Sequence, residues 1–219
     1  VSTGAPQDMK QKFILLARDE MGKQIKETPD DMRYELLIGS FLNSVGAPDE
    51  AIAHLERAIE LSPSKQSTYF ELANSYLGKG QYDKALLTMK TAYEIEPKNG
   101  TARDVYAVIA IYNKNFDLAK ELLVPVYGTI AVPDDRFIQA FAAVKDYETV
   151  INIWKERILK AQTAGADNAQ FHVSLAAAYL ANEERTKAIA ELEKATELNP
   201  EFKAQADYYI GEIRAGRNP

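Results

Sequence analysis

The hydrophobic residues between Tyr69 and Pro97 follow the spacing of two amphipathic helices separated by a short polar turn. The residues that share a face are Leu72, Ala73 and Tyr76 in the first helix and Ala85, Met89 and Ala92 in the second. Gly78 and Gly80 interrupt the pattern between the helices, and Pro97 ends it. A helical hairpin of this size cannot bury its apolar face alone, so it needs similar hairpins as neighbours.

Such hairpins recur along the chain with a constant spacing. Pro29, Pro63 and Pro97 are 34 residues apart, and so are Ala17, Ala51, Ala85 and Ala119. Three segments share the pattern of small and bulky residues: Ile38, Gly39, Leu42, Ala51, Leu55, Ala58 and Pro63; Tyr69, Leu72, Ala73, Tyr76, Tyr82, Ala85, Met89, Ala92 and Pro97; and His172, Leu175, Ala176, Tyr179, Ala188, Leu192, Ala195 and Pro200. On these residues the chain resembles the tetratricopeptide-repeat family over nearly its whole length.

The resemblance implies an all-α fold, a right-handed α-solenoid of helix–turn–helix repeats. We expect about five full repeats, an N-terminal half-repeat and a C-terminal capping helix. Small residues are expected where two helices cross closely, with larger residues packed around them. The expected segments are residues 1–7 (disordered or cut tail), 8–30 (half-repeat helix), 31–64, 65–98, 99–132, 133–166 and 167–200 (repeats one to five), and 201–219 (capping helix and tail).

Some segments depart from the regular pattern. The helix over 8–26 either completes an upstream repeat, from which the chain was excised, or is a coincidental amphipathic cap. Pro125 lies where the second helix of the third repeat should continue, so we expect a kink or an end near Val124. The loop after Pro125 is either a tolerated irregularity or a bend that re-aims the superhelix. The fourth repeat is the least regular, and Trp154 is expected in its core.

The composition limits the class of partner. The 219 residues are 46% hydrophobic and 26% charged, with a formal net charge of −6, which is ordinary for a soluble protein. No Lys/Arg-rich run occurs, so nucleic acid is not an expected partner. No apolar run of about 18 residues occurs, so direct membrane insertion of this segment is not expected. The absence of cysteine excludes disulfides and fits an extracytoplasmic bacterial domain.

The sequence offers little for catalysis. It contains two histidines, of which His54 is expected to face solvent and His172 to stand at an opening-aromatic position of its repeat. No metal-spaced cluster, Gly-rich phosphate loop or nucleophile motif occurs. The carboxylates recur with the helices and are typical of solvated outer faces. We therefore predict a protein that is not an enzyme, with no catalytic residue, cofactor or metal.

In the family that the chain resembles, first helices line a concave face that receives a peptide or a partner helix. The positions of that face are Arg33, Leu36, Ser40, Asn43, Phe70, Asn74, Leu77, Asp104, Val108, Ile111, Tyr112, Asp135 and Gln139. Phe70, Leu77, Val108, Ile111 and Tyr112 are expected to form its apolar floor, with Asn74 available for hydrogen bonds. The alternative is that adjacent first helices bury much of this floor themselves.

The expected partner is a protein or peptide that is neutral or basic and carries apolar anchors. Chaperone-binding members of the family hold a terminal carboxylate with basic residues. Here Phe70 and Asp104 stand at such positions, so an acidic C-terminal peptide is a poor candidate. We expect a monomer or weak self-association, and a self-assembling array is a further alternative.

A narrower resemblance concerns residues 21–86 and 102–112. These segments are similar to the repeat region that follows the membrane part of bacterial O-antigen ligase/polymerase-like proteins. That resemblance implies an accessory domain on the extracytoplasmic side of a membrane, organising partners or glycan assembly as part of a longer protein. It also implies that the chemistry belongs to the membrane domain and not to these repeats.

Overall fold

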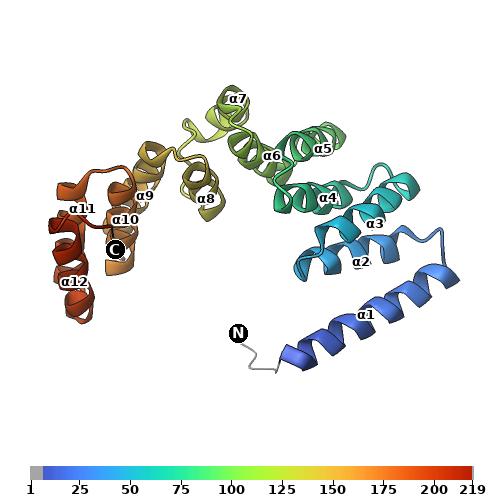
Figure 1. Cartoon of the computed structure of the whole chain (residues 1–219). Coiled ribbons are helices and arrows are strands. Elements are labelled where there is room, and N and C mark those ends of the chain that lie inside the picture. The colour runs from blue at the N-terminus through green and yellow to red at the C-terminus, as the bar shows by residue number, and fades with distance from the viewer. Residues whose placement is uncertain (1–6, 219) are drawn as a thin grey trace. The chain divides into compact units, whose positions relative to one another are not determined.

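The computed structural model describes residues 7–218, and these residues contain twelve α-helices, one short 3₁₀ helix and no β-strand (Figure 1). The predicted all-α fold is thus confirmed. The predicted tail lies outside the described residues except for Gln7, which begins the first helix. The chain forms two compact units, one through Leu122 and one from Leu123, which we call the N-terminal and the C-terminal unit.

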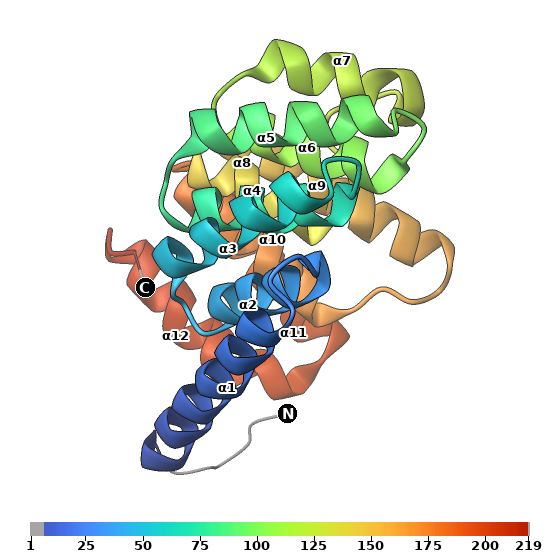
Figure 2. The same ribbon diagram turned by 90° about the vertical axis from the view of Figure 1, so that its right-hand side faces the viewer.

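The N-terminal unit contains six helices and most of a seventh. They are α1 (Gln7–Glu27), α2 (Met32–Ser44), α3 (Pro48–Leu61), α4 (Gln66–Gly78), α5 (Tyr82–Ile95), α6 (Gly100–Tyr112) and the start of α7 (Phe116–Tyr127). From α1 to α6, each helix packs against the next, and α1 lies at the end of the stack against α2 (Figure 2). The first helices of successive hairpins also touch, α2 with α4 and α4 with α6.

The C-terminal unit contains the end of α7 and the remaining helices. They are α8 (Asp135–Ala143), α9 (Tyr147–Thr163), α10 (Ala169–Ala181), α11 (Arg185–Leu198), the 3₁₀ turn η1 (Pro200–Phe202) and α12 (Lys203–Arg214). The packed pairs are α8 with α9, α9 with α10, α10 with α11, and α11 with α12. Asn or Asp caps begin α8, α9 and α10, where Asp134, Asp146 and Asn168 accept backbone N–H groups.

Small residues lie at the closest helix crossings, as the repeat pattern predicts. Ala51, Ala85 and Ala188 have no exposed surface. Gly39 has no room for a side chain, because a Cβ built there would lie 2.5 Å from Cγ of Leu55. The close contact between α2 and α3 therefore depends on glycine at this position.

The helix that carries Pro125 does not end before the proline. α7 continues through Pro125 to Tyr127, so the predicted end near Val124 is wrong by three residues. Pro125 lies in the last turn, where it removes only one amide donor from the helix. The backbone N–H of Gly128 then donates to Val124 at 2.8 Å and closes the turn.

Within residues 7–218, none of the helices combines the length and apolar character that a bilayer crossing requires.

Candidate functional site

An open groove runs between the first helices α2 and α4 of the N-terminal unit and has a volume of about 520 Å³. Its lining comes from α2 (Met32, Arg33, Leu36, Leu37, Ser40) and from the start of α4 (Lys65, Ser67, Glu71). Leu37 is 52% exposed, so an apolar side chain is available to an occupant. Three predicted partner-binding residues, Arg33, Leu36 and Ser40, therefore lie together in one groove.

A polar network that includes Glu71, one of the lining residues, joins α2 to α4. The Asn43 amide donates to the Glu71 backbone carbonyl at 2.9 Å and to its carboxylate at 3.1 Å. The Ser75 hydroxyl donates to Oδ1 of Asn43 at 2.7 Å. Asn43, which was predicted to bind a partner, thus uses its hydrogen-bonding groups to join α2 to α4.

Charge at the groove is balanced. The Arg33 guanidinium donates to Asp31 at 2.9 and 2.5 Å, and Asp31 also caps α2 by accepting the Arg33 N–H. Side-chain and then backbone hydrogen bonds from Arg33 lower the pKa of Asp31 to about 2. Lys65 and Glu71 add one charge of each sign to the lining. The groove therefore combines apolar floor residues with a mixed rim.

The predicted apolar floor is only partly present at the surface. Phe70 and Leu77 are half-buried on α4, and Asn74 is exposed. Val108 and Ile111 are only 8% and 0% exposed, so the expectation that they face a partner is wrong. α6 is apolar around most of its circumference and is buried from Tyr106 to Ile111, which places these side chains in the core.

Tyr112 lies at a different place from the groove residues. Its ring stacks on Tyr82 with centroids 5.8 Å apart and an interplanar angle of 9°. The two rings line a hollow at the hairpin turns together with Lys84 and Lys114. Burial, followed by the neighbouring Tyr82, raises the pKa of Tyr112.

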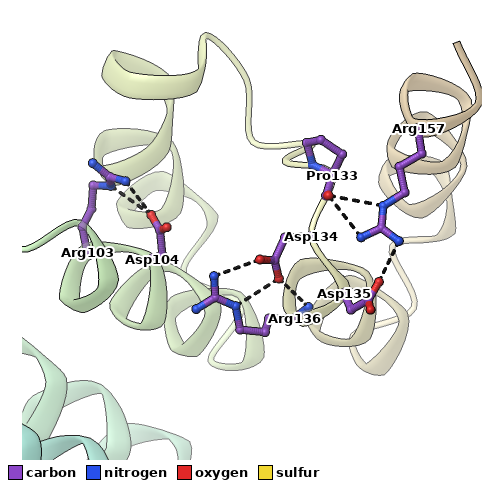
Figure 3. Close-up of polar contacts among 7 residues, drawn as sticks. All are labelled: Arg103, Asp104, Pro133, Asp134, Asp135, Arg136 and Arg157. Carbon is purple, nitrogen blue, oxygen red and sulfur yellow. Dashed lines mark hydrogen bonds and ion pairs between the residues drawn. The ribbon is translucent and has the colours of Figure 1, made fainter. Parts of the chain in front are cut away.

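Of the remaining predicted residues, Asp104 and Asp135 form local pairs (Figure 3), and Gln139 is exposed. In the N-terminal unit, Asp104 accepts from the Arg103 guanidinium at 3.0 and 2.8 Å. In the C-terminal unit, Asp135 forms a 2.7 Å ion pair with Arg157, and Gln139 is exposed. Arg157 also donates to the Pro133 carbonyl at 3.3 and 3.1 Å. These bonds attach the irregular loop that precedes α8 to the helix α9.

The predicted residues do not include the α4 side of the groove, which Lys65, Ser67 and Glu71 line. Lys65 and Glu71 lie at register positions that the prediction did not use, whereas Ser67 is in register with Arg33 and was predictable from it. The predicted residues also end before the fifth repeat. There, α10 and α12 enclose a smaller apolar hollow of about 240 Å³ lined by Val173, Ala177, Leu180 and Tyr209 among others. Val173, Ala177 and Leu180 are in register with Leu36, Ser40 and Asn43 when Ala176 is aligned with Gly39, so the repeat pattern was the available signal.

Both histidines pair with carboxylates across a hairpin. Nδ1 of His54 lies 2.7 Å from Glu35, and Nδ1 of His172 lies 2.7 Å from Glu191. The His172 ring is buried, and the His54 ring is partly covered rather than facing solvent as predicted. In the described residues, no group of three or more His, Cys, Asp or Glu side chains is arranged to hold a metal ion.

Comparisons with known proteins agree with the register of the helices. Family profiles described as tetratricopeptide repeat match residues 42–91 and 169–202. The search of curated proteins gives no match. One similar solved structure is that of YrrB, described as a TPR protein with an unusual peptide-binding site. The two sequences are 21% identical, the match covers 86% of this chain and 97% of YrrB, and the TM-score is 0.51.

Two other solved structures share the fold. A tetratricopeptide repeat protein from Parabacteroides merdae has 14% identity, coverage of 91% of this chain and 78% of that one, and a TM-score of 0.59. A putative kinesin light chain from Podospora anserina with nearly identical TPR-like repeats has 18% identity, coverage of 80% and 98%, and a TM-score of 0.58.

The stacked hairpins, their 34-residue register and the small residues at their crossings define an all-α solenoid repeat protein. The two family matches identify tetratricopeptide repeats at residues 42–91 and 169–202, and the fold of the described residues is that of a tetratricopeptide-repeat solenoid. Neither match concerns O-antigen ligases, and that narrower resemblance stays an expectation.

Proposed function

We propose that the protein is a non-catalytic interaction scaffold that receives a peptide or helix of a partner in the groove between α2 and α4. The observation that supports this most directly is the groove itself, whose lining combines Leu36 and Leu37 with Arg33, Lys65 and Glu71. Exposed apolar side chains bordered by polar groups are typical of peptide-binding surfaces.

The lining favours a particular kind of peptide. The apolar residues of α2 would bury one or two apolar anchors of the partner, which is where such grooves gain affinity. The mixed charges of Lys65 and Glu71 offer no strong field of one sign, so a peptide that is close to neutral fits this groove. The peptide-binding site named for YrrB supports the class of function and not its location in this chain.

The experiment is a peptide selection followed by a matched pair of variants. Peptides are selected by phage display on the full chain, and their affinities are measured by calorimetry. Leu37→Glu is expected to weaken binding at least tenfold, because it places a charge among the anchors. The control is Leu159→Glu on α9, since Leu159 is similarly exposed at 64%.

Two outcomes would contradict the proposal. One is affinity that Leu37→Glu leaves unchanged while circular dichroism shows intact helices. The other is equal loss in the Leu159→Glu control, which would indicate a general effect of surface charge.

A further inference from the structure

Asn99 is the one asparagine of the chain that is followed by glycine. It caps α6, since its Oδ1 accepts the backbone N–H groups of Thr101 at 3.0 Å and Ala102 at 3.3 Å. Gly100 is the first residue of α6, so its own N–H has no partner within the helix. The side-chain amide of Asn99 is therefore followed by a backbone nitrogen that no side chain shields.

The side chain of Asn99 also ends a chain of hydrogen bonds that joins α4, α5 and α6. Its Nδ2 donates to Oε1 of Gln66 at 2.5 Å, and Nε2 of Gln66 donates to the carbonyl of Ala92 at 2.8 Å. Gln66 is the first residue of α4. Ala92 lies in the last turn of α5, where helix carbonyls lack intrahelical partners. Gln66 thus attaches the start of α4 to the end of α5 and to the start of α6.

The direction of these bonds cannot be reversed. A carbonyl only accepts, so Gln66 must turn its amide nitrogen towards Ala92 and its oxygen towards Asn99. The backbone N–H groups of α6 only donate, so Asn99 must turn its oxygen towards them and its nitrogen towards Gln66. A carboxylate in place of the Asn99 amide would keep the cap, but it would face the Gln66 oxygen with a second acceptor.

The backbone of Asn99 prevents attack by Gly100 in the folded structure. Deamidation passes through a five-membered imide ring, in which the Gly100 nitrogen lies on the same side of the Cα–C bond as Cβ of Asn99. For an L-residue this geometry requires a negative ψ, whereas Asn99 has φ −72° and ψ 106°. The nitrogen therefore reaches Cγ only when the first turn of α6 opens and the bond to Gln66 breaks.

We propose that Asn99 is a site of spontaneous deamidation and that its conversion detaches Gln66 from α6 irreversibly. The Gly100 nitrogen attacks Cγ of Asn99 and gives up its proton, and the side-chain amide leaves as ammonia. Water then opens the imide at either carbonyl and gives aspartate or isoaspartate at position 99. Gln66 slows the reaction, since its bond must break before Asn99 can turn. The reaction needs no partner and does not depend on the α2–α4 groove.

The rate of conversion tests the role of the fold. Peptide mass spectrometry follows the full chain at pH 8 and 37 °C, where each conversion adds about 1 Da. Asn99 should convert about tenfold faster or more in urea than in the native chain, because the turn is then open. Gln66→Met removes both side-chain bonds and should raise the native rate about threefold or more. Gln162→Met is the control, since Gln162 donates to Asp167 at 3.0 Å in the C-terminal unit.

Asn99→Asp installs the product directly and tests its effect on α4. Hydrogen exchange over residues 66–72 is expected to be about fivefold faster or more than in the wild type, because Gln66 is no longer held. Asn168→Asp is the matched control. Asn168 also caps a first helix by accepting the Phe171 N–H at 3.2 Å, and within the described residues its amide nitrogen has no hydrogen bond. Exchange over α10 should therefore stay at the wild-type rate.

The following results would overturn the proposal. Conversion in urea that is absent, or no faster than in the native chain, would show that the fold does not control a reaction at Asn99. So would a Gln66→Met chain that converts no faster than Gln162→Met while circular dichroism shows intact helices. Wild-type exchange over residues 66–72 in Asn99→Asp would show that conversion detaches nothing. Gly100→Ala should slow conversion in urea, and an unchanged rate would exclude the imide route.

Discussion

Two hairpins, the first in the N-terminal unit and the fifth in the C-terminal unit, each pair an acid with an imidazole. The pairs occupy the same two repeat positions, but in opposite order. In the first hairpin, Glu35 lies on α2 and His54 on α3. In the fifth, His172 lies on α10 and Glu191 on α11. Both pairs have an N···O distance of 2.7 Å. The second hairpin has Tyr69 and Thr88 at these positions, so the repeat does not require an ion pair there.

The first-helix member is the buried one in both pairs. Side-chain exposure is 8% for Glu35 against 32% for His54, and 5% for His172 against 23% for Glu191. The repeat geometry thus decides which position is buried, and the local sequence decides whether an acid or an imidazole fills it. The two positions must carry complementary groups, an acid opposite an imidazole, because an unpaired buried charge is costly.

The buried imidazole has a second partner. Nε2 of His172 lies 3.3 Å from Asp167, which also accepts from Gln162 at 3.0 Å. Burial acts to raise the pKa of Asp167, but hydrogen bonds from Gln162 and His172 outweigh it, and the net pKa is lowered. The fifth hairpin therefore contains an acid–imidazole–acid cluster where the first contains a single pair.

The largest expected effect comes from deleting the buried ring. We expect His172→Ala to lower the free energy of unfolding by about 3 kcal/mol, because it leaves a cavity, removes the imidazole from Glu191 and leaves Asp167 with Gln162 alone. Urea unfolding followed by Trp154 fluorescence reports it, since the single tryptophan lies 5.9 Å from the ring of the adjacent Phe171.

The matched variant is His54→Ala, which removes a partly exposed ring that solvent can replace. It is expected to lower the free energy of unfolding by about 1 kcal/mol. This unfolding is followed by circular dichroism, because His54 lies in the N-terminal unit and Trp154 in the C-terminal unit. Equal losses in the two variants would show that the second carboxylate contributes nothing.

The next effect tests whether the two orders are interchangeable. Glu35→His and His54→Glu are each expected to lower the free energy of unfolding by about 2 kcal/mol, since each places like groups in contact. The double exchange recreates the order of the fifth hairpin and should recover most of that loss. A double-mutant cycle by urea unfolding measures the coupling, expected above about 1 kcal/mol. Strict additivity of the two single changes would contradict the complementarity of the pair.

A third difference concerns the closest crossing, where the first hairpin has Gly39 and the fifth has Ala176. Gly39→Ala is expected to lower the free energy of unfolding by about 1 kcal/mol or more, because its Cβ would meet Leu55 at 2.5 Å. Thermal unfolding checks it against Gly22→Ala in α1, where nothing lies within 4 Å. Gly22→Ala should stabilise by up to about 1 kcal/mol through helix propensity. A Gly39→Ala variant as stable as wild type would mean that the crossing can relax.

A smaller effect is expected at the hairpin turns. Gly46 and Gly80 adopt φ of 78° and 67° in the N-terminal unit, whereas Glu183 adopts 63° at the corresponding position of the fifth hairpin. A left-handed conformation costs a non-glycine residue about 1 kcal/mol. Glu183→Gly is therefore expected to raise the melting temperature slightly, and Gly46→Glu to lower it. No change in either variant would show that the turn conformation relaxes around the side chain.

The hairpins were predictable from sequence because the spacing of their apolar residues is set by the covalent chain and recurs regularly through the first three repeats. Ala51 and Ala85 could be placed at crossings from the 34-residue period alone, and Ala188 from the residue pattern that the fifth repeat shares with the earlier ones. The surface was harder to predict, because exposure depends on how each first helix is rotated and on its neighbours. The period suggested that Val108 and Ile111 face outward, but α6 is apolar on several sides and is buried there. The His54–Glu35 pair escaped notice because its two members are 19 residues apart in sequence and meet only across the hairpin.

The smallest expected effect is a loss of stability that appears only at alkaline pH. It distinguishes two tyrosines at equivalent repeat positions. Both rings lie near lysine ammonium groups, Tyr76 near Lys84 and Tyr179 near Lys155 and Lys187. The Tyr76 hydroxyl in addition donates to Glu56 at 3.0 Å. Burial, and then the bond to Glu56, raises the pKa of Tyr76 to about 12. Because the folded-state pKa lies above the unfolded value of about 10, the stabilisation is complete below pH 10. It is lost as the pH rises towards 12.

The measurement is thermal unfolding of the full chain between pH 9 and pH 11. The wild-type melting temperature should fall more steeply above pH 10 than that of Tyr76→Phe, which has no phenol to ionise at this position. Tyr179→Phe is the matched variant, which removes a phenol at the equivalent position of the fifth hairpin. If Tyr76→Phe shows the same slope as the wild type, other groups control the alkaline loss of stability. The environment of Tyr76 would then be no different, energetically, from that of its counterpart in the fifth hairpin.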